Sequence, residues 1–239
     1  NQSLNMELNN QLAIITGVSR GIGYHVAHQL LEQGAKVAGW GRTEPEGLNY
    51  EQFKFYKADV KDYNSLEGAY NLTKRDFGQS PAMLINNAGY GNFKPVEEFT
   101  VEEWHDIFQT NVHGPFYTTK LTVPDMKEQQ YGHIINIGSI AGIQGQPQGT
   151  AYNGTKYALR GFSDCLFKEV RDYGVKVTCV FPGSVQTNFF DNAPGMEPNP
   201  NMMRPEDVAL ELVRLFQTHD NFLINEMTFR PLMPKGPPQ

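Results

Sequence analysis

The stretch Thr16-Gly-Val-Ser-Arg-Gly-Ile-Gly23 joins a short apolar run, residues 12–16, to a helix-prone run, residues 21–33. Glycine supplies the backbone freedom that a tight turn from a strand into a helix needs. Backbone N–H groups at such a turn, together with the positive end of the helix, can receive a pyrophosphate. The glycines are spaced GxxxGxG rather than GxGxxG, so on their own they also fit a simple structural turn. The stretch predicts a strand, a turn and a helix, and other motifs must decide whether the turn binds a nucleotide.

Outward from this turn, short apolar runs alternate with longer amphipathic ones, which is typical of a parallel sheet covered by helices on both faces. Thr100 with Glu103 predicts a capping box, and Pro205 fits a first helical turn. Residues 41–52 contain Pro45 and Gly47, so no full crossover helix is expected there. The predicted strands are residues 12–16, 36–40, 53–57, 83–86, 133–138 and 176–181, with a weaker one near 221–229. The predicted helices are residues 21–33, 65–77, 101–127, 151–173 and 205–218.

The bulk composition predicts one α/β domain over residues 1–239. A net charge of -6 and 39% hydrophobic residues argue against a disordered chain or a general nucleic-acid binder, so small molecules are the expected partners. No run approaches the ~20 apolar residues of a membrane span, and the polar start lacks a secretory signal. A cytoplasmic protein with no membrane partner is expected. Residues 1–10 are expected to be disordered or expression-derived, and residues 1–5, which fit either an expression remnant or an extended natural terminus, are left out of the fold argument.

The cysteine and histidine patterns give no metal site. Cys165 and Cys179 have no metal-ligand spacing and are predicted to be free, buried thiols in a reducing compartment. The six histidines include no HExxH motif and no pairing with cysteine. No GxSxG motif occurs, so hydrolysis is not favoured either.

Tyr152 and Lys156 are four residues apart in a predicted helix, with Ser139 thirteen residues upstream. Positions i and i+4 share one helix face, so the Lys156 ammonium can approach the Tyr152 phenol. A nearby cation stabilises the phenolate and lowers a phenol pKa from its usual value of about 10 toward neutrality. Together with the glycine turn, this combination predicts carbonyl chemistry that depends on a nicotinamide cofactor.

Taken in order, the motifs resemble those of the short-chain dehydrogenase/reductase family, in its single-domain subclass with TGxxxGIG and YxxxK motifs. The resemblance implies a Rossmann-type, doubly wound, seven-stranded parallel sheet that binds a dinucleotide at the carboxyl ends of its strands. It covers about residues 12–187 and rests on Thr16 to Gly23, Asp59-Val60, Asn86-Asn-Ala-Gly89, Asn111, Ser139, Tyr152 with Lys156, Pro182-Gly183 and Thr187.

The resemblance also implies the cofactor contacts. Asp59 would accept from the adenine amine, and Thr187 would bond the nicotinamide carboxamide or a phosphate. In the same family, Lys156 would also bind the nicotinamide ribose. The implied cofactor-binding residues are Gly17, Ser19, Arg20, Gly21, Ile22, Gly23, Arg42, Asp59, Val60, Asn87, Ala88, Gly89, Tyr152, Lys156, Pro182, Gly183, Val185 and Thr187.

NADP(H) is predicted over NAD(H). Enzymes of this kind that prefer NAD usually carry an acidic residue at the end of the second strand, where this chain has Gly41 followed by Arg42. A glycine leaves room for a 2'-phosphate, and the planar Arg42 guanidinium can pair with it. Arg20 faces the same region in the family. Taken singly, either arginine also fits a solvated loop charge.

The implied reaction interconverts a ketone or aldehyde and its alcohol by hydride transfer, with Tyr152 as general acid/base. Ser139 would polarise the substrate oxygen, and Asn111 would position a water between Lys156 and solvent. Two alternatives are weighed: an NADP(H)-sensing regulator, disfavoured because the Tyr-Lys pair is intact, and a sugar-nucleotide epimerase or dehydratase, disfavoured by chain length. The substrate remains open.

Two further expectations concern the later part of the chain. Residues 187–204 contain Phe189, Phe190, Met202 and Met203, which look exposed and predict a loop that closes over a partly apolar substrate. Relatives commonly pair through the helices at residues 101–127 and 151–173, so a homodimer or homotetramer is expected. A tetramer cannot be assumed, because the C-terminal run from Asn225 lacks the family's Asp-Gly-Gly ending.

Overall fold

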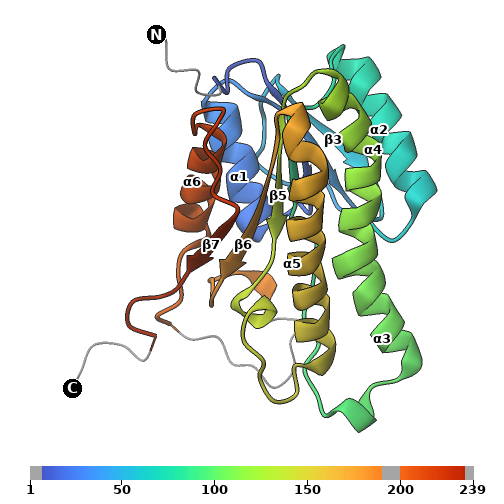
Figure 1. Ribbon diagram of the computed structural model, residues 1–239, viewed down its shortest axis with the longest axis vertical. Coiled ribbons are helices and arrows are strands. Elements are labelled where there is room, and N and C mark those ends of the chain that lie inside the picture. Colours follow the sequence, from blue (N-terminus) through green and yellow to red (C-terminus); the bar gives the residue numbers. More distant parts are fainter. Residues whose placement is uncertain (1–6, 190–199, 235–239) are drawn as a thin grey trace.

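The computed structural model describes residues 7–189 and 200–234 and, within them, places seven parallel strands in one sheet (Figure 1). The strand order is β3-β2-β1-β4-β5-β6-β7. From β1 the chain adds β2 and β3 on one side and then β4 to β7 on the other, which makes the sheet doubly wound. The predicted Rossmann-type α/β fold is confirmed. The strands are β1 (Leu12–Thr16), β2 (Lys36–Gly41), β3 (Phe53–Lys57), β4 (Met83–Asn86), β5 (Gly132–Ile137), β6 (Val175–Pro182) and β7 (Glu226–Phe229).

Helices cover both faces of the sheet, as predicted (Figure 1). Short helical turns η1 (Val96–Glu98), η3 (Ile140–Gly142) and η4 (Arg171–Tyr173) and a π-helical turn η2 (Gln109–His113) complete the described elements. The α-helices are α1 (Gly21–Glu32), α2 (Tyr63–Phe77), α3 (Val101–Phe108), α4 (Gly114–Glu128), α5 (Thr150–Val170) and α6 (Pro205–Phe216).

Strand β1 shows how the two faces are built. Its Ile15 packs into the core beneath α1 and α6, whereas its Ile14 packs into the core beneath α2, α4 and α5. Successive side chains of a strand point to opposite faces, so a continuous apolar run fits a strand that is covered twice. Burial of each large apolar side chain contributes roughly 1.5–3 kcal/mol relative to exposure.

The local signals at helix ends are confirmed. Thr100 accepts a hydrogen bond from the Glu103 N–H, and the Glu103 carboxylate accepts one from the Thr100 N–H, so the capping box at α3 is complete. Pro205 lies in the first turn of α6. As predicted, no helix joins β2 and β3 in the described chain.

The single helix predicted over residues 101–127 is wrong. The chain forms α3, then the π-helical turn, then α4, with Pro115 in the first turn of α4 where its missing N–H costs least. The predicted helix over residues 151–173 also ends early, because η4 and Gly174, at φ +71°, follow α5. The weak strand predicted at residues 221–229 is reduced to β7.

The two cysteines have different environments. Cys179 is buried in β6, as predicted, but the prediction that Cys165 is buried is wrong because Cys165 is exposed on α5. Within residues 7–189 and 200–234, no helix is long and apolar enough to cross a membrane. In the same described ranges, no three His, Cys, Asp or Glu side chains gather as metal ligands.

Candidate active site

The turn between β1 and α1 needs glycine for two separate reasons. Gly17 at φ +74° and Gly21 at φ +63° adopt the left-handed backbone that residues with a Cβ disfavour. At Gly23, a Cβ would lie 2.4 Å from both the Gly17 carbonyl oxygen and the Asn87 amide nitrogen. Arg20, the N-cap residue of α1, makes no side-chain cap, so the first N–H groups of α1 are left for another acceptor.

Asn87 fastens this turn to the loop after β4. Its Nδ2 donates to the carbonyl oxygens of Thr16 at 3.0 Å and Gly17 at 2.9 Å. The Thr16 hydroxyl in turn accepts from the backbone N–H groups of Asn87 and Ala88, each at 3.1 Å. The Asn87 side chain is therefore used inside the protein, and its loop contributes backbone to the site.

Ser139, Tyr152 and Lys156 meet where β5 ends beside the first turns of α5. Ser139 caps η3, with its Oγ accepting from the Ala141 N–H at 3.1 Å. Tyr152 and Lys156 are both buried on α5, and the Lys156 Nζ lies 5.6 Å from the centre of the Tyr152 ring. The predicted grouping of these three side chains is what the structure shows.

The pKa of Tyr152 departs from the sequence-based expectation. Burial raises the pKa of Tyr152 to about 12, and a hydrogen bond with Ser139 acts in the opposite direction. Burial also lowers the pKa of Lys156 to about 8. The prediction that Lys156 lowers the phenol pKa toward neutrality is therefore wrong for the isolated chain. The reason is that burial dominates and the Lys156 Nζ donates to the Ile137 carbonyl oxygen at 2.8 Å.

Asn111 lies in the π-helical turn and is buried. Its Nδ2 donates to the Tyr90 carbonyl oxygen at 2.9 Å and the Thr155 hydroxyl at 3.1 Å, while its Oδ1 accepts from the Tyr90 N–H at 3.1 Å. A Cβ on Gly89 would lie 3.0 Å from this Oδ1 and 3.7 Å from the Lys156 Nζ. Asn111 and Lys156 are therefore close neighbours with Gly89 between them.

Most of the predicted site residues line one cleft of about 1180 Å³ at the carboxyl ends of the strands. Gly23 and Asn111 are the predicted residues that do not line it, and both lie behind its wall. The predicted residues in the lining are Gly17, Ser19, Arg20, Gly21, Ile22, Arg42, Asp59, Val60, Asn87, Ala88, Gly89, Ser139, Tyr152, Lys156, Pro182, Gly183, Val185 and Thr187.

One end of the cleft is rich in charge. Gly41 ends β2, and neither Arg42 nor Arg20 forms an ion pair within the described chain. Glu44 and Glu46 line the same end.

Three further lining residues were not predicted, and one of them, Tyr90, packs against the apolar cluster that contains Phe93 and Tyr152. Lys61 binds Asp106 with its Nζ 2.9 Å from Oδ1, and the Tyr90 hydroxyl donates to Oδ2 at 2.6 Å. Hydrogen bonds from Tyr90 and Lys61, and the charge of Arg42, lower the pKa of the Asp106 carboxyl. Only Lys61 had a sequence signal, because it follows Asp59-Val60 directly.

The other end of the cleft is aromatic. The ring centre of Phe93 lies 5.2 Å from that of Tyr152, and the ring centre of Phe189 lies 5.5 Å from it. Phe93 was not predicted, because it lies in an irregular stretch without periodicity. Its only signal was its place four residues after the Asn-Ala-Gly segment.

The loop predicted over residues 187–204 is described only in part, since residues 190–199, including Phe190, lie outside the described residues. Phe189 lies beside Tyr152, with ring centres 5.5 Å apart, and is half-buried rather than exposed. The prediction that Met202 and Met203 are exposed is wrong, because both are half-buried. Met203 packs against the core beneath α1 and α6 and pairs with Val185 after β6.

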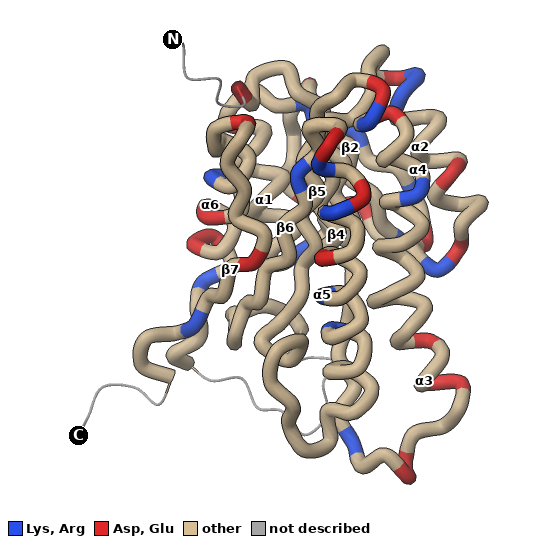
Figure 2. The backbone as a smooth tube through the Cα atoms, viewed as in Figure 1, with Lys and Arg blue, Asp and Glu red and all other residues tan. Residues whose placement is uncertain are grey.

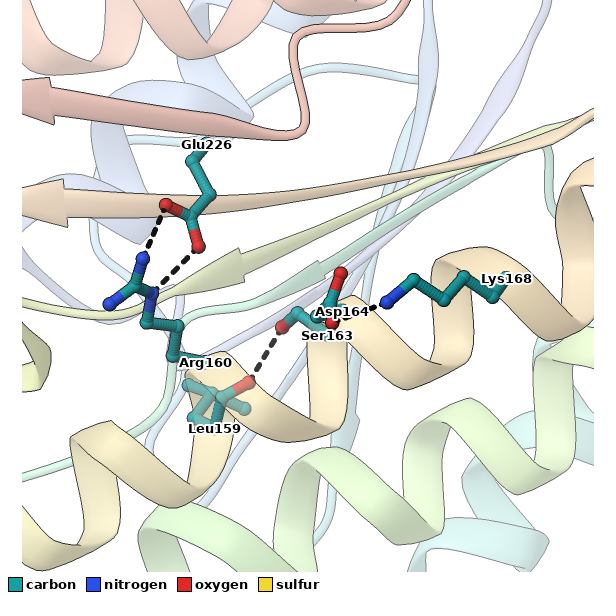
Figure 3. A network of polar contacts seen from close by, with 6 residues as sticks. All are labelled: Leu159, Arg160, Ser163, Asp164, Lys168 and Glu226. Carbon is teal, nitrogen blue, oxygen red and sulfur yellow. Dashed lines mark hydrogen bonds and ion pairs between the residues drawn. The ribbon is translucent and has the colours of Figure 1, made fainter.

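Helix α5 is fixed to the sheet one turn beyond Lys156. Arg160 forms a two-pronged ion pair with Glu226 of β7, at 2.7 Å and 3.0 Å (Figure 3). The Ser163 hydroxyl donates to the Leu159 carbonyl oxygen and accepts from Asn136 of β5 at 2.9 Å. These contacts hold the helix that carries Tyr152 and Lys156. Elsewhere, basic and acidic residues are interspersed on α2 and α6, whereas α3 carries acidic residues (Figure 2).

The comparisons with known proteins agree with this geometry. The model of the short chain dehydrogenase family matches residues 11–197. The chain is 31% identical over 231 residues to an uncharacterized oxidoreductase of Staphylococcus aureus (strain USA300), covering 94% of this chain and 99% of that protein.

Two solved structures share the fold. A serine dehydrogenase in its closed form, complexed with NADP+, matches with a TM-score of 0.87 and 28% identity over 93% of this chain and 96% of that chain. An alcohol dehydrogenase from the archaeon Thermococcus sibiricus, complexed with 5-hydroxy-NADP, matches with a TM-score of 0.83 and 26% identity over 97% and 100%. With its fold, its cleft and these matches taken together, the chain belongs to the short-chain dehydrogenase family and is an oxidoreductase of that family.

Proposed function

We propose that the protein is an NADP(H)-dependent oxidoreductase that interconverts a ketone or aldehyde and the corresponding alcohol. The observation that carries this proposal is the meeting of Ser139, Tyr152 and Lys156 in the cleft onto which the glycine turn opens. These groups supply a proton donor, a hydrogen-bond donor and a cation within one site.

The residues of the cleft suit a dinucleotide. At Gly21, a Cβ would lie 3.2 Å from the Thr187 methyl group, so the glycine keeps a narrow passage open between the turn and the segment after β6. The uncapped first turn of α1 offers N–H groups and a partial positive charge there. In the proposed complex the turn holds the pyrophosphate, Asp59 and Val60 hold the adenine, and Lys156 holds the nicotinamide ribose.

The preference for NADP(H) is supported by charge. Arg20 and Arg42 line the cleft, and neither forms an ion pair within the described residues, so both are available to a phosphate. Gly41 leaves the end of β2 without a carboxylate. The two solved relatives described above are complexed with NADP+ and 5-hydroxy-NADP, which supports the same preference.

The nicotinamide supplies or accepts the hydride when it is bound, and the protein handles the proton. In reduction, the Tyr152 hydroxyl gives its proton to the carbonyl oxygen, and its raised pKa keeps the hydroxyl protonated at neutral pH. Ser139 donates a hydrogen bond to the same oxygen, where negative charge develops. In oxidation, Tyr152 takes the proton back from the alcohol.

Lys156 and Asn111 are proposed to return a proton to Tyr152 after Tyr152 has protonated the substrate. Below about pH 8 Lys156 is charged, and in the proposed reaction this charge stabilises the phenolate that forms only when Tyr152 gives its proton to the substrate. Asn111 holds the loop at Tyr90 and lies against Gly89, next to Lys156. This placement suits the proposed role of keeping a water path open between Lys156 and solvent.

We also propose a homodimer or homotetramer. Three exposed apolar side chains, Trp104 on α3, Phe116 on α4 and Tyr157 on α5, support a contact between copies. Analytical ultracentrifugation tests this point, and a sedimenting mass near 26.9 kDa would contradict it.

The central test mixes purified protein with NADPH and a panel of neutral and charged ketones and aldehydes, and follows the absorbance of the reduced nicotinamide. Turnover is expected with the native chain. Tyr152→Phe should lose activity by about 10³-fold or more while NADPH affinity, measured by fluorescence titration, stays nearly constant. NADPH binding with no turnover across the panel favours a non-catalytic sensor instead, and substantial turnover by Tyr152→Phe removes Tyr152 as the acid.

A further inference from the structure

The wall of the cleft around the Tyr152 phenol is built from aromatic rings. Phe93 and Phe189 each contact Tyr152, and their own ring centres lie 6.4 Å apart. Tyr152 and Phe93 belong to one apolar cluster with Ala141, and Phe189 packs against it. A substrate whose carbonyl oxygen reaches the Tyr152 hydroxyl must therefore lie against flat apolar surfaces.

Gly91 contributes to the same wall through its bare backbone. A Cβ at Gly91 would lie 2.4 Å from Phe189 Cζ and 2.7 Å from Phe93 Cε2. The rings of Phe93 and Phe189 thus pack directly against the backbone at Gly91, and this contact fixes their place in the cleft.

Three of the four lysine and arginine residues in the described lining lie away from this wall. Among the described lining residues, Arg20, Arg42 and Lys61 belong to the segments after β1, β2 and β3, at the end proposed for the adenosine. The remaining lining cation, Lys156, donates to the Ile137 carbonyl oxygen. At the aromatic end, therefore, the described lining offers no arginine, and its one lysine, Lys156, is bonded to Ile137 and, in the proposed complex, holds the nicotinamide ribose.

The nearest cation in sequence to Phe93 is already neutralised. The Lys94 Nζ lies 2.6 Å from a carboxylate oxygen of Glu103, and Glu103 itself lines the cleft. Among the described residues, the cation next to Phe93 is therefore not available to a substrate.

A carboxylate or phosphate on the substrate would lose its water here without gaining a counter-ion, which is costly. A flat apolar group would instead gain burial and ring contacts. We propose that the substrate is an uncharged carbonyl compound with an aromatic or similar flat apolar group beside its carbonyl, and that the site rejects oxo acids. This inference rests on the proposed function, because it assigns the substrate class of the same site.

The test uses two ligands that differ in charge at nearly constant shape, methyl 4-acetylbenzoate and 4-acetylbenzoate. Calorimetry measures the affinity of each for the full chain saturated with NADP+, and the NADPH absorbance measures the turnover of each. The ester is expected to bind roughly 30-fold tighter or more, because only the acid loses charge solvation. Equal or tighter binding of the acid, or binding of neither ligand, overturns the inference.

Two substitutions sharpen the result. Gln146 lines the cleft, and Gln146→Arg should narrow the ratio of ester to acid affinity by about tenfold, because it adds the missing counter-ion. Phe189→Ala should weaken ester binding by about tenfold while Phe189→Leu, the control that keeps apolar bulk, changes it little. An unchanged affinity ratio in Gln146→Arg and unchanged ester affinity in Phe189→Ala would contradict the inferred contacts.

The binding and turnover measurements separate this inference from the proposed function. Preferential binding of the ester without reduction of either compound upholds the neutral, flat site and contradicts the proposed reduction of carbonyl compounds at that site. Equal reduction of ester and acid upholds the oxidoreductase assignment and contradicts the inferred substrate class.

Discussion

Lys156 is anchored to the end of β5, since its Nζ donates a hydrogen bond to the Ile137 carbonyl oxygen at 2.8 Å. A backbone carbonyl satisfies one ammonium proton without adding a negative charge. Burial therefore remains the dominant influence and lowers the pKa of Lys156 to about 8. The charge that assists Tyr152 is expected to disappear just above physiological pH.

The pH dependence of reduction follows from this. Lys156 is charged below about pH 8 and neutral above it, while Tyr152, with a pKa of about 12, remains protonated throughout this range. We expect kcat/KM for NADPH-dependent reduction to fall about tenfold per pH unit above pH 8. Lys156→Arg keeps its charge, so its profile should stay flat to at least about pH 10. An identical fall in native and Lys156→Arg proteins would assign the fall to another group.

Cofactor choice is tested at the two arginines that line the cleft. Arg20→Ala and Arg42→Ala should each weaken NADPH binding by about tenfold, because each removes a cation facing a phosphate, and should change NADH binding little. Fluorescence titration with NADPH and with NADH gives the ratio of the two affinities for each variant. Arg75→Ala, which removes an exposed arginine of α2, is the matched control. Equal effects on NADPH and NADH would assign the arginines to general electrostatics.

The crowding at Gly23 predicts a loss of stability. Gly23→Ala forces a Cβ to within 2.4 Å of the Gly17 carbonyl oxygen and the Asn87 amide, and should lower the free energy of unfolding by about 1–3 kcal/mol. The control is Gly161→Ala in α5, where a Cβ meets no atom within 4 Å. That change should raise stability by about 0.5–1 kcal/mol, because alanine favours helix. Urea denaturation compares both, and a neutral Gly23→Ala would contradict the packing described.

Acid sensitivity is predicted from His133 on β5. Burial lowers the pKa of His133 to about 3. In the unfolded chain His133 is therefore protonated below about pH 6.5, whereas in the folded chain it stays neutral down to about pH 3. The stabilisation is complete above pH 6.5 and is lost as the pH falls from 6.5 toward 3. Between pH 6.5 and 5 the free energy of unfolding should drop by about 1–2 kcal/mol. His133→Asn should flatten this drop and the exposed control His105→Gln should not, as urea denaturation at each pH would reveal.

Much of the fold could be predicted because its signals are local. The apolar runs of β1 and β4, the Thr100–Glu103 capping box and the glycine spacing each depend on neighbouring residues. The grouping of Ser139, Tyr152 and Lys156 followed from helix periodicity and the order of motifs. These features needed no knowledge of distant contacts.

The features that sequence missed depend on groups that meet only in the folded chain. The pKa of Tyr152 is set by burial, which helix spacing does not report. The link between Lys61 and Asp106 joins residues 45 positions apart. Met203 looked exposed because its pairing partner, Val185, lies across a segment with no periodic pattern.

The π-helical turn Gln109–His113 has a consequence for how this chain tolerates changes of length. Removing one residue from it would restore ordinary helical winding and rotate α3 relative to α4 by about 100°. Asp106 would then swing away from Lys61, or α4 would turn Met126 out of the core. The extra residue thus sets the rotation between α3 and α4, so that each helix faces its own neighbours. Deleting a residue from this turn is expected to destabilise the protein more than deleting a residue from a surface loop.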